Sequence, residues 1–232
     1  MAAYQGVFMA QHTRELRFAG DGVSLAGQID YPAHTPPQNG FPLIFVLHHA
    51  GCNSREDYQH YADAGLQQGY AVFRWDKRGT GRSGAGGRGS TTQDAVNAYE
   101  TALEQPHVNR KLAYIIAQGG GTRLLGSAFG LFARVQMPKG VVLVGNRLTP
   151  EEVLAITTRL HIIHGTKDWN DWRTYGEEAA KAHKNKYRYG TSHFICEGAD
   201  KGLYDADGLF HNAALQNLSD WLANQWAVSS SI

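Results

Sequence analysis

Residues 111–125 read KLAYIIAQGGGTRLL, and the pattern of this segment indicates the class of fold. An apolar run rich in β-branched residues, from Tyr114 to Ala117, predicts a strand that is buried on both faces. Three consecutive glycines follow at 119–121, and a helix-like pattern begins at Thr122. The segment therefore predicts a strand, a tight turn and a helix in immediate succession.

The rest of the chain alternates predicted strands with predicted helices. Residues 14–18 and 23–31 alternate apolar and polar side chains around Gly20-Asp21-Gly22 and predict an antiparallel hairpin. The other predicted strands are 43–47, 70–75, 112–117, 141–144, 160–164 and 186–189, and the predicted helices are 54–68, 92–104, a short one with a capping box at 149–152, and 209–226. This order predicts one α/β domain over residues 1–232, with a mostly parallel sheet covered by helices on both faces.

The composition of the chain argues against several classes of protein. The formal net charge is +1 with interspersed charges, so we expect no nucleic-acid or membrane partner. No apolar run approaches the length of a membrane span and no signal-peptide pattern is present, so we expect a soluble, cytoplasmic protein. Cys52 and Cys196 are too few for a disulfide framework. The eleven histidines lack metal-ligand spacing, so no metal or other cofactor is expected.

Four stretches of the chain resemble the α/β-hydrolase family, and the resemblance covers nearly the whole length. LIFVLHHAGCNS resembles the strand and oxyanion loop, and FRWDKRGTGRSG resembles the D-x-R-G-x-G-x-S loop. YIIAQGGGTR resembles the nucleophile elbow G-x-S-x-G, and IIHGTKDWN followed by GTSHF resembles the acid and histidine loops. The resemblance implies an α/β-hydrolase fold with an N-terminal hairpin. Only one short helix is predicted between Val144 and Leu160, so no lid domain is expected there.

The resemblance also implies the roles of three residues. Gly119 occupies the position of the nucleophilic serine, so that position is vacant. Asp168 corresponds to the triad acid, which orients the histidine, and His193 corresponds to the general base. The nucleophile of an elbow has a positive φ, which glycine adopts freely, so we expect the fold to survive without the serine.

The expected donors of the oxyanion hole come from two segments of the chain. The N–H of Gly120 is one expected donor, and Ala50 or Gly51 is expected to supply the second. The choice depends on whether His48 or His49 takes the histidine position of the family. Adjacent histidines on a strand point to opposite faces, so we expect one to face the pocket and the other to be a hydrogen-bonded core residue.

Two functions are compatible with this pattern. The resemblance implies a carboxylic-ester hydrolase for a small ester or related acyl compound, working as a monomer or homodimer. The missing serine, lost by design or naturally, makes this chain an inactive or substrate-trapping variant, and Gly119→Ser is expected to restore activity. The alternative is a non-catalytic protein that binds a small carboxylate or ester, because three glycine N–H groups at a helix N-terminus can hold an anion.

Two further features bear on the pocket. Trp169 and Trp172 follow Asp168 closely, and they either line an acyl or aromatic pocket or pack against the last helix. The loop 198–208, GADKGLYDADG, is longer than the connection requires and is expected to border the pocket.

Overall fold

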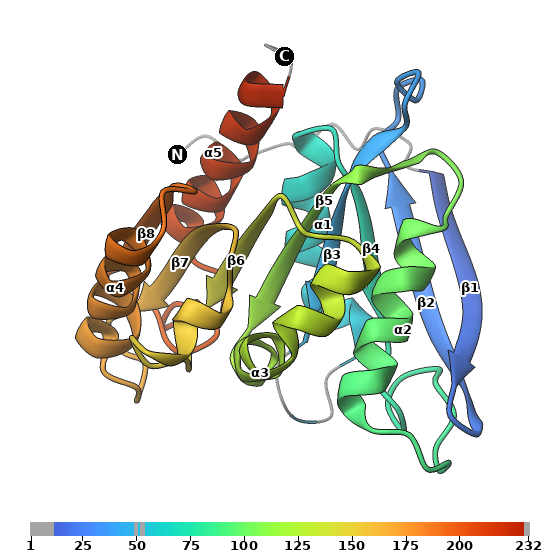
Figure 1. The fold of residues 1–232 in the computed structure, drawn as a ribbon, viewed down its shortest axis with the longest axis horizontal. Coiled ribbons are helices and arrows are strands. Elements are labelled where there is room, and N and C mark those ends of the chain that lie inside the picture. The colour runs from blue at the N-terminus through green and yellow to red at the C-terminus, as the bar shows by residue number, and fades with distance from the viewer. Residues whose placement is uncertain (1–11, 49–50, 52–53, 230–232) are drawn as a thin grey trace.

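The described chain contains one eight-stranded sheet with the strand order β1-β2-β4-β3-β5-β6-β7-β8 (Figure 1). The computed structural model describes residues 12–48, 51 and 54–229. The strands are β1 (His12–Gly20), β2 (Val23–Tyr31), β3 (Phe41–Leu47), β4 (Ala71–Trp75), β5 (Val108–Gln118), β6 (Gly140–Val144), β7 (Arg159–Gly165) and β8 (Thr191–Cys196). β2 pairs antiparallel with β1 and with β4, and all other neighbours are parallel. The predicted mostly parallel sheet and its N-terminal hairpin are confirmed.

Helices cover both faces of the sheet because the central strands are apolar on both sides. Every residue of β3, β4 and β6 is buried. One core packs α2 and α3 against the sheet, and the other packs α1 and α5; Figure 1 shows α2, α3 and α4 in front of the sheet. The α-helices are α1 (Gln59–Gln67), α2 (Thr91–Leu103), α3 (Gly120–Val135), α4 (Ala179–Lys186) and α5 (Asn212–Ser229). No helix in the described residues is long and apolar enough to cross a membrane.

The connection between β6 and β7 is short. In residues 145–158 the predicted helix is reduced to a single 3₁₀ turn, η2 (Glu152–Ala155). Its capping box is present: the Thr149 N–H donates to Glu152 Oε2 at 3.0 Å, and the Glu152 N–H donates to Thr149 Oγ1 at 3.2 Å. The carboxyl ends of these strands therefore carry no inserted lid.

The last part of the sheet differs from the prediction. The strand predicted at 186–189 is wrong, because Lys186 ends α4 and the strand that pairs with β7 is β8. The sequence analysis also assigned no element to the π-helical turn η3 (Arg173–Glu178) or to α4. Both are rich in charged residues, so their apolar face is narrow and the periodic signal is weak. The error moved the expected end of the last strand toward the N-terminus of the chain.

One buried ion pair joins β2 to β4, and a second pair, whose carboxylate is half exposed, joins β1 to the segment before α1. Arg74 donates to Asp30 at 2.7 Å, and both side chains are 2% exposed. Arg55, also 2% exposed, donates through Nη2 to Glu15 at 2.8 Å. An ion inside a protein is strongly destabilising when its partner is removed. These pairs therefore fix the antiparallel edge to the rest of the sheet.

We predict that Asp30→Ala lowers the free energy of unfolding by about 3–5 kcal/mol, because it leaves the Arg74 guanidinium buried without its carboxylate. Urea denaturation measures the change. The matched control is Arg123→Ala, which removes an exposed pair with Glu152 at 3.8 Å and should change stability by less than about 1 kcal/mol. Equal losses in the two variants would contradict the role assigned to the buried pair.

Candidate active site

The turn between β5 and α3 has the backbone of a nucleophile elbow. Gly119 has φ 52° and ψ −113°, so the predicted positive φ is confirmed. The Gly119 N–H donates to the carbonyl oxygen of Val144 at 2.9 Å, and the Thr122 hydroxyl donates to the Gly119 carbonyl at 2.7 Å. Gly120 begins α3, and Gly121 lies against the carbonyls that end β3. The turn is thus held between β3 and β6 without any side chain at 119.

The loop after β4 is a structural support for this edge of the sheet. The Asp76 carboxylate is fully buried and accepts the backbone N–H groups of Arg55 at 2.8 Å and Arg82 at 2.9 Å. Ser83 donates its hydroxyl to the Asp76 carbonyl at 2.6 Å. Gly81 lies so close that an added Cβ would be 2.4 Å from the Asp76 carboxyl carbon. The D-x-R-G-x-G-x-S pattern therefore folds a tight loop around one carboxylate.

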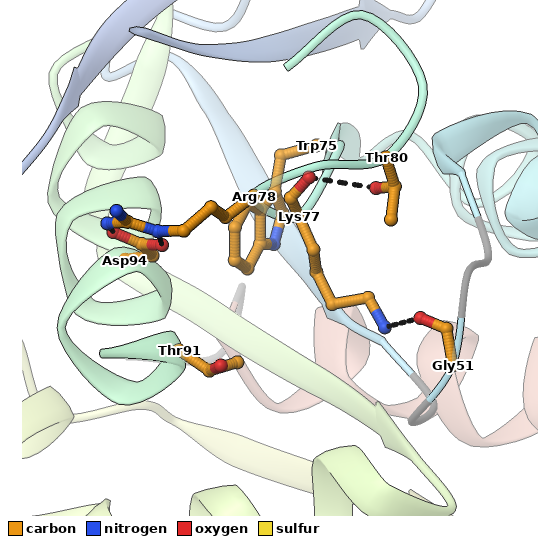
Figure 2. A pocket seen from close by; sticks show the side chains of 7 residues that line it. All are labelled: Gly51, Trp75, Lys77, Arg78, Thr80, Thr91 and Asp94. Atoms are coloured by element: carbon orange, nitrogen blue, oxygen red, sulfur yellow. Dashed lines mark hydrogen bonds and ion pairs between the residues drawn. The ribbon is translucent and has the colours of Figure 1, made fainter. Parts of the chain in front are cut away.

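A cavity of about 300 Å³ lies on the β3–β4 side of the elbow, between this loop and the start of α2 (Figure 2). Most of the polar side chains that line it form ion pairs or hydrogen bonds with one another or with the backbone. Arg78 pairs with Asp94 at 2.8 Å, and Lys77 donates to the Gly51 carbonyl at 2.6 Å. The indole N–H of Trp75, which is buried, has no hydrogen-bond partner among the described residues.

His48 is a core residue. Its ring stacks between Tyr58 and Trp75, with centroid distances of 4.9 Å and 5.1 Å. Neither ring nitrogen has a hydrogen-bond partner in the described part of the chain, so the expectation of a hydrogen-bonded core histidine is wrong for His48. Burial, then the charges of Lys77 and Arg74, lower the pKa of His48 to about 3. The imidazole is therefore neutral at physiological pH.

The other expected oxyanion residues are only partly described. His49 and Ala50 lie outside the described residues. Gly51 is described and exposed, with φ 114°. Gly120 stands at the start of α3, where its N–H belongs to the positive end of the helix dipole. In the residues that the structure describes, no group of three or more His, Cys, Asp or Glu side chains could hold a metal ion.

Asp168 lies at the carboxyl end of β7, where the resemblance places the triad acid. Its side chain is fully buried. Oδ1 accepts the backbone N–H and the side-chain amide of Asn170, at 3.0 Å and 3.2 Å. Oδ2 lies 3.4 Å from His164 Nε2 and has no hydrogen-bond partner within the described ranges. Burial lowers the pKa of His164 below its usual value, and the neighbouring Asp168 opposes this shift.

The structure does not bring His193 to Asp168. His193 belongs to β8 itself, in register with Ile162 of β7, and it is exposed. β8 is the edge strand and lies three strands from β5, which is about 14 Å at the usual strand spacing. The assignment of His193 as the general base is therefore wrong. It followed from placing the last strand at 186–189, which left residue 193 beyond the end of the strand.

The backbone of the loop after β8 passes near Asp168 at Lys201. A Cβ added to Gly145 would be 2.4 Å from the Lys201 carbonyl oxygen and 3.5 Å from Asp168 Oδ2. The Lys167 N–H donates to the Ala199 carbonyl at 2.9 Å, so the loop is tied across the carboxyl ends of β6 and β7. The sequence analysis missed Lys201. The signal that could have found it is the excess length of loop 198–208, which was noted.

Comparisons with known proteins agree with this architecture. The model of the family described as serine aminopeptidase S33 matches residues 42–123, from β3 to the first turn of α3. Est1E from Butyrivibrio proteoclasticus, solved with ferulic acid, has a TM-score of 0.68 over 94% of this chain and 100% of its own, at 15% identity. The chain has the α/β-hydrolase fold.

Two further structures share this α/β-hydrolase fold. The esterase domain of a Rhodothermus marinus protein has a TM-score of 0.63 at 19% identity, covering 93% of this chain and 98% of its own. An alpha-beta serine hydrolase homologue from Coxiella burnetii has a TM-score of 0.62 at 15% identity, covering 91% and 96%. No curated protein matches the chain. At these identities the structures show the fold alone.

The glycines of α3 and its turn allow a test of the packing at the elbow. A Cβ at Gly121 would lie 2.4 Å from the His48 carbonyl oxygen and 2.5 Å from that of Leu47. We predict that Gly121→Ala lowers the free energy of unfolding by about 1–3 kcal/mol or more, measured by urea denaturation. The control is Gly130→Ala, where an added Cβ meets nothing within 4 Å; it should stabilise the protein by about 0.5–1 kcal/mol. A tolerated alanine at 121 would refute the close approach.

The stacked histidine makes stability depend on pH. The unfolded chain protonates His48 near pH 6.5, whereas the folded protein holds its pKa at about 3. The contribution of the neutral ring is therefore complete above about pH 6.5 and is lost as the pH falls toward 3. Between about pH 7.5 and pH 5, we predict that wild type loses about 2 kcal/mol more than His48→Phe, measured by urea unfolding at each pH.

The control for this measurement is Tyr58→Phe, which alters the same stack without altering the histidine. It should keep the pH slope of wild type. An unchanged slope in His48→Phe would show that other groups cause the acid sensitivity.

Proposed function

We propose that the chain is a binding protein built on a hydrolase fold, and that it holds a small ester or carboxylate without hydrolysing it. The proposal rests on which residues occupy the positions of the catalytic triad. Gly119 stands at the nucleophile position with the elbow backbone intact, and the imidazole beside Asp168 Oδ2 is that of His164, a fully buried residue of β7. Two of the three triad groups, a nucleophile and an accessible base, are thus missing.

Each missing group removes a separate chemical step. Without a hydroxyl at 119 there is no oxygen to form an acyl-enzyme, and loss of this group alone costs about a million-fold in turnover in a serine protease. The imidazole beside Asp168, that of His164, is fully buried in β7, so we place no base where it could take the proton of a nucleophile or return it to the leaving group. A water molecule in the vacated space would lack a base for the same reason.

The parts that bind an acyl group remain. α3 is 16 residues long, so the N–H groups of its first turn retain their attraction for an anion or a carbonyl oxygen. The absent serine side chain leaves additional space at the turn. No lid covers this edge of the sheet, which favours a small ligand that enters directly from solvent.

An ester hydrolase that lacks only its serine is the competing proposal. The buried Asp168 favours this proposal, because burying a carboxylate costs folding free energy, and a catalytic role would explain why it is there. The position of His193 weighs against it, because the proposal requires an intact base. The two proposals differ in whether a base is already present. Restoring the serine alone and restoring the serine together with a histidine therefore distinguish them.

We predict that wild type, Gly119→Ser and Lys201→His all fail to turn over p-nitrophenyl acetate and butyrate above background. The double variant Gly119→Ser/Lys201→His should exceed each of them by at least about 100-fold, because general acid–base catalysis contributes about 10²–10⁴-fold once both groups are present. Initial rates of p-nitrophenol release measure the activity, and circular dichroism confirms that each variant is folded.

Each outcome bears on one proposal. Ordinary esterase turnover by Gly119→Ser alone would establish the competing hydrolase, since it would show that a base is already in place. A folded double variant with no activity would refute the placement of Lys201 beside Asp168. Calorimetry of wild type with the intact esters and with acetate and butyrate tests binding directly, and absence of binding for all of them would refute the binding function.

A further inference from the structure

An exposed tryptophan stands at the carboxyl edge of the sheet, directly after Asp168. Trp169 is 73% exposed, more than any other large hydrophobic side chain in the described part of the protein. A side chain this exposed is not packed against the last helix. An indole has a large apolar face, so an exposed indole can stack on the apolar part of a ligand.

Two cationic side chains converge on this ring. The Arg147 guanidinium carbon lies 5.1 Å from the ring centroid, and Lys201 Nζ lies 5.3 Å from it. Both distances are within the range of a cation–π contact. The three side chains come from three different loops, after β6, β7 and β8, and together we call them the Trp169 cluster. A second tryptophan, Trp172, meets only its sequence neighbour Arg173, at 4.8 Å.

The charges of the Trp169 cluster are not balanced by neighbouring carboxylates. Among the described residues, neither Arg147 nor Lys201 forms an ion pair. Asp168 and Asp200, which precede Trp169 and Lys201 in the sequence, pair with neither cation. Asp200 Oδ1 accepts the backbone N–H groups of Gly202 and Tyr204, and Asp168 is fully buried. Two like charges held at one ring attract a counter-ion.

The backbone ties the Trp169 cluster to the elbow. The Arg147 N–H donates to Thr122 Oγ1 at 3.0 Å, and the Thr122 hydroxyl in turn donates to the carbonyl of Gly119. The Lys201 backbone lies against Gly145 at the end of β6. Both cations are therefore fixed at the rim of the vacant site, beside the positive end of the α3 dipole. The cavity lined by Trp75, described above, lies on the β3–β4 side of the elbow and is separate from the Trp169 cluster.

We propose that the Trp169 cluster recognises an oxyanion, a carboxylate or a phosphate, carried by the ligand of this site. Arg147 supplies a planar fork that can bind two oxygens, Lys201 supplies a point charge, and the indole supplies an apolar face for the group attached to the anion. The inference deepens the proposed function and rests on it for the location of the ligand. It specifies an anionic aryl or acyl compound in place of a neutral ester.

Titration calorimetry and quenching of tryptophan fluorescence test the proposal with four probes. Benzoate and phenyl phosphate should bind, and neutral benzamide should bind at least tenfold more weakly. Inorganic phosphate distinguishes recognition of the anion alone from recognition of the anion with its ring. Binding of benzoate should weaken as salt is raised, because the contacts are charged and exposed. Trp169→Phe should remove the quenching.

Charge-removing variants locate the site. Arg147→Gln and Lys201→Gln should each weaken benzoate or phenyl phosphate binding about tenfold, whereas Arg173→Gln, which removes the cation beside Trp172, should bind as wild type does. Wild-type affinity in both cluster variants, equal binding of benzamide and benzoate, or no binding of any oxyanion at millimolar concentration would overturn the proposal. Turnover of the esters by wild type would instead refute the proposed function without bearing on the anion site.

Discussion

The close approach of Gly121 to the end of β3 is the constraint on which this site depends. Two backbone carbonyls, of Leu47 and His48, stand where any side chain at 121 would begin. With Gly119 in the left-handed region, this approach turns the chain sharply from β5 into α3. The turn also sets the first N–H groups of α3 between the ends of β3 and β6. None of these requirements involves a serine, so the backbone of a hydrolase site persists in a chain without its nucleophile.

The structure separates the parts of the site that support the fold from those that perform chemistry. Asp76 is surrounded by backbone donors and serves the loop after β4. Asp168 accepts hydrogen bonds from Asn170 through Oδ1, whereas Oδ2 has no hydrogen-bond partner among the described residues and lies 3.4 Å from His164 Nε2. Buried polar atoms without partners are uncommon. The oxygen Oδ2 of Asp168 is therefore the atom at this edge whose position the support of the fold does not explain.

Local patterns predicted most of the fold. The alternation in β1 and β2 and the continuous apolar runs of β3, β4 and β6 identified their strands correctly. A strand buried on one face alternates apolar and polar residues, and a strand buried on both faces is apolar throughout. Charged residues obscured α4, and the resulting misplacement of β8 produced the wrong role for His193. Arg55 and Arg74 could not be predicted as buried residues, because their carboxylate partners come from distant segments. Lys201 was missed because a histidine was expected and one lay nearby in the sequence.

Residues 119 and 201, which the proposed function treats as altered triad positions, lie on different loops, one before α3 and one after β8. If hydrolysis requires a serine at 119 and a histidine at 201 together, neither reversion by itself restores an activity that natural selection can detect. A lineage that carries both replacements would need two reversions, and the first would bring no advantage. Loss of hydrolysis would then be hard to reverse, and the fold could accumulate changes suited to another ligand.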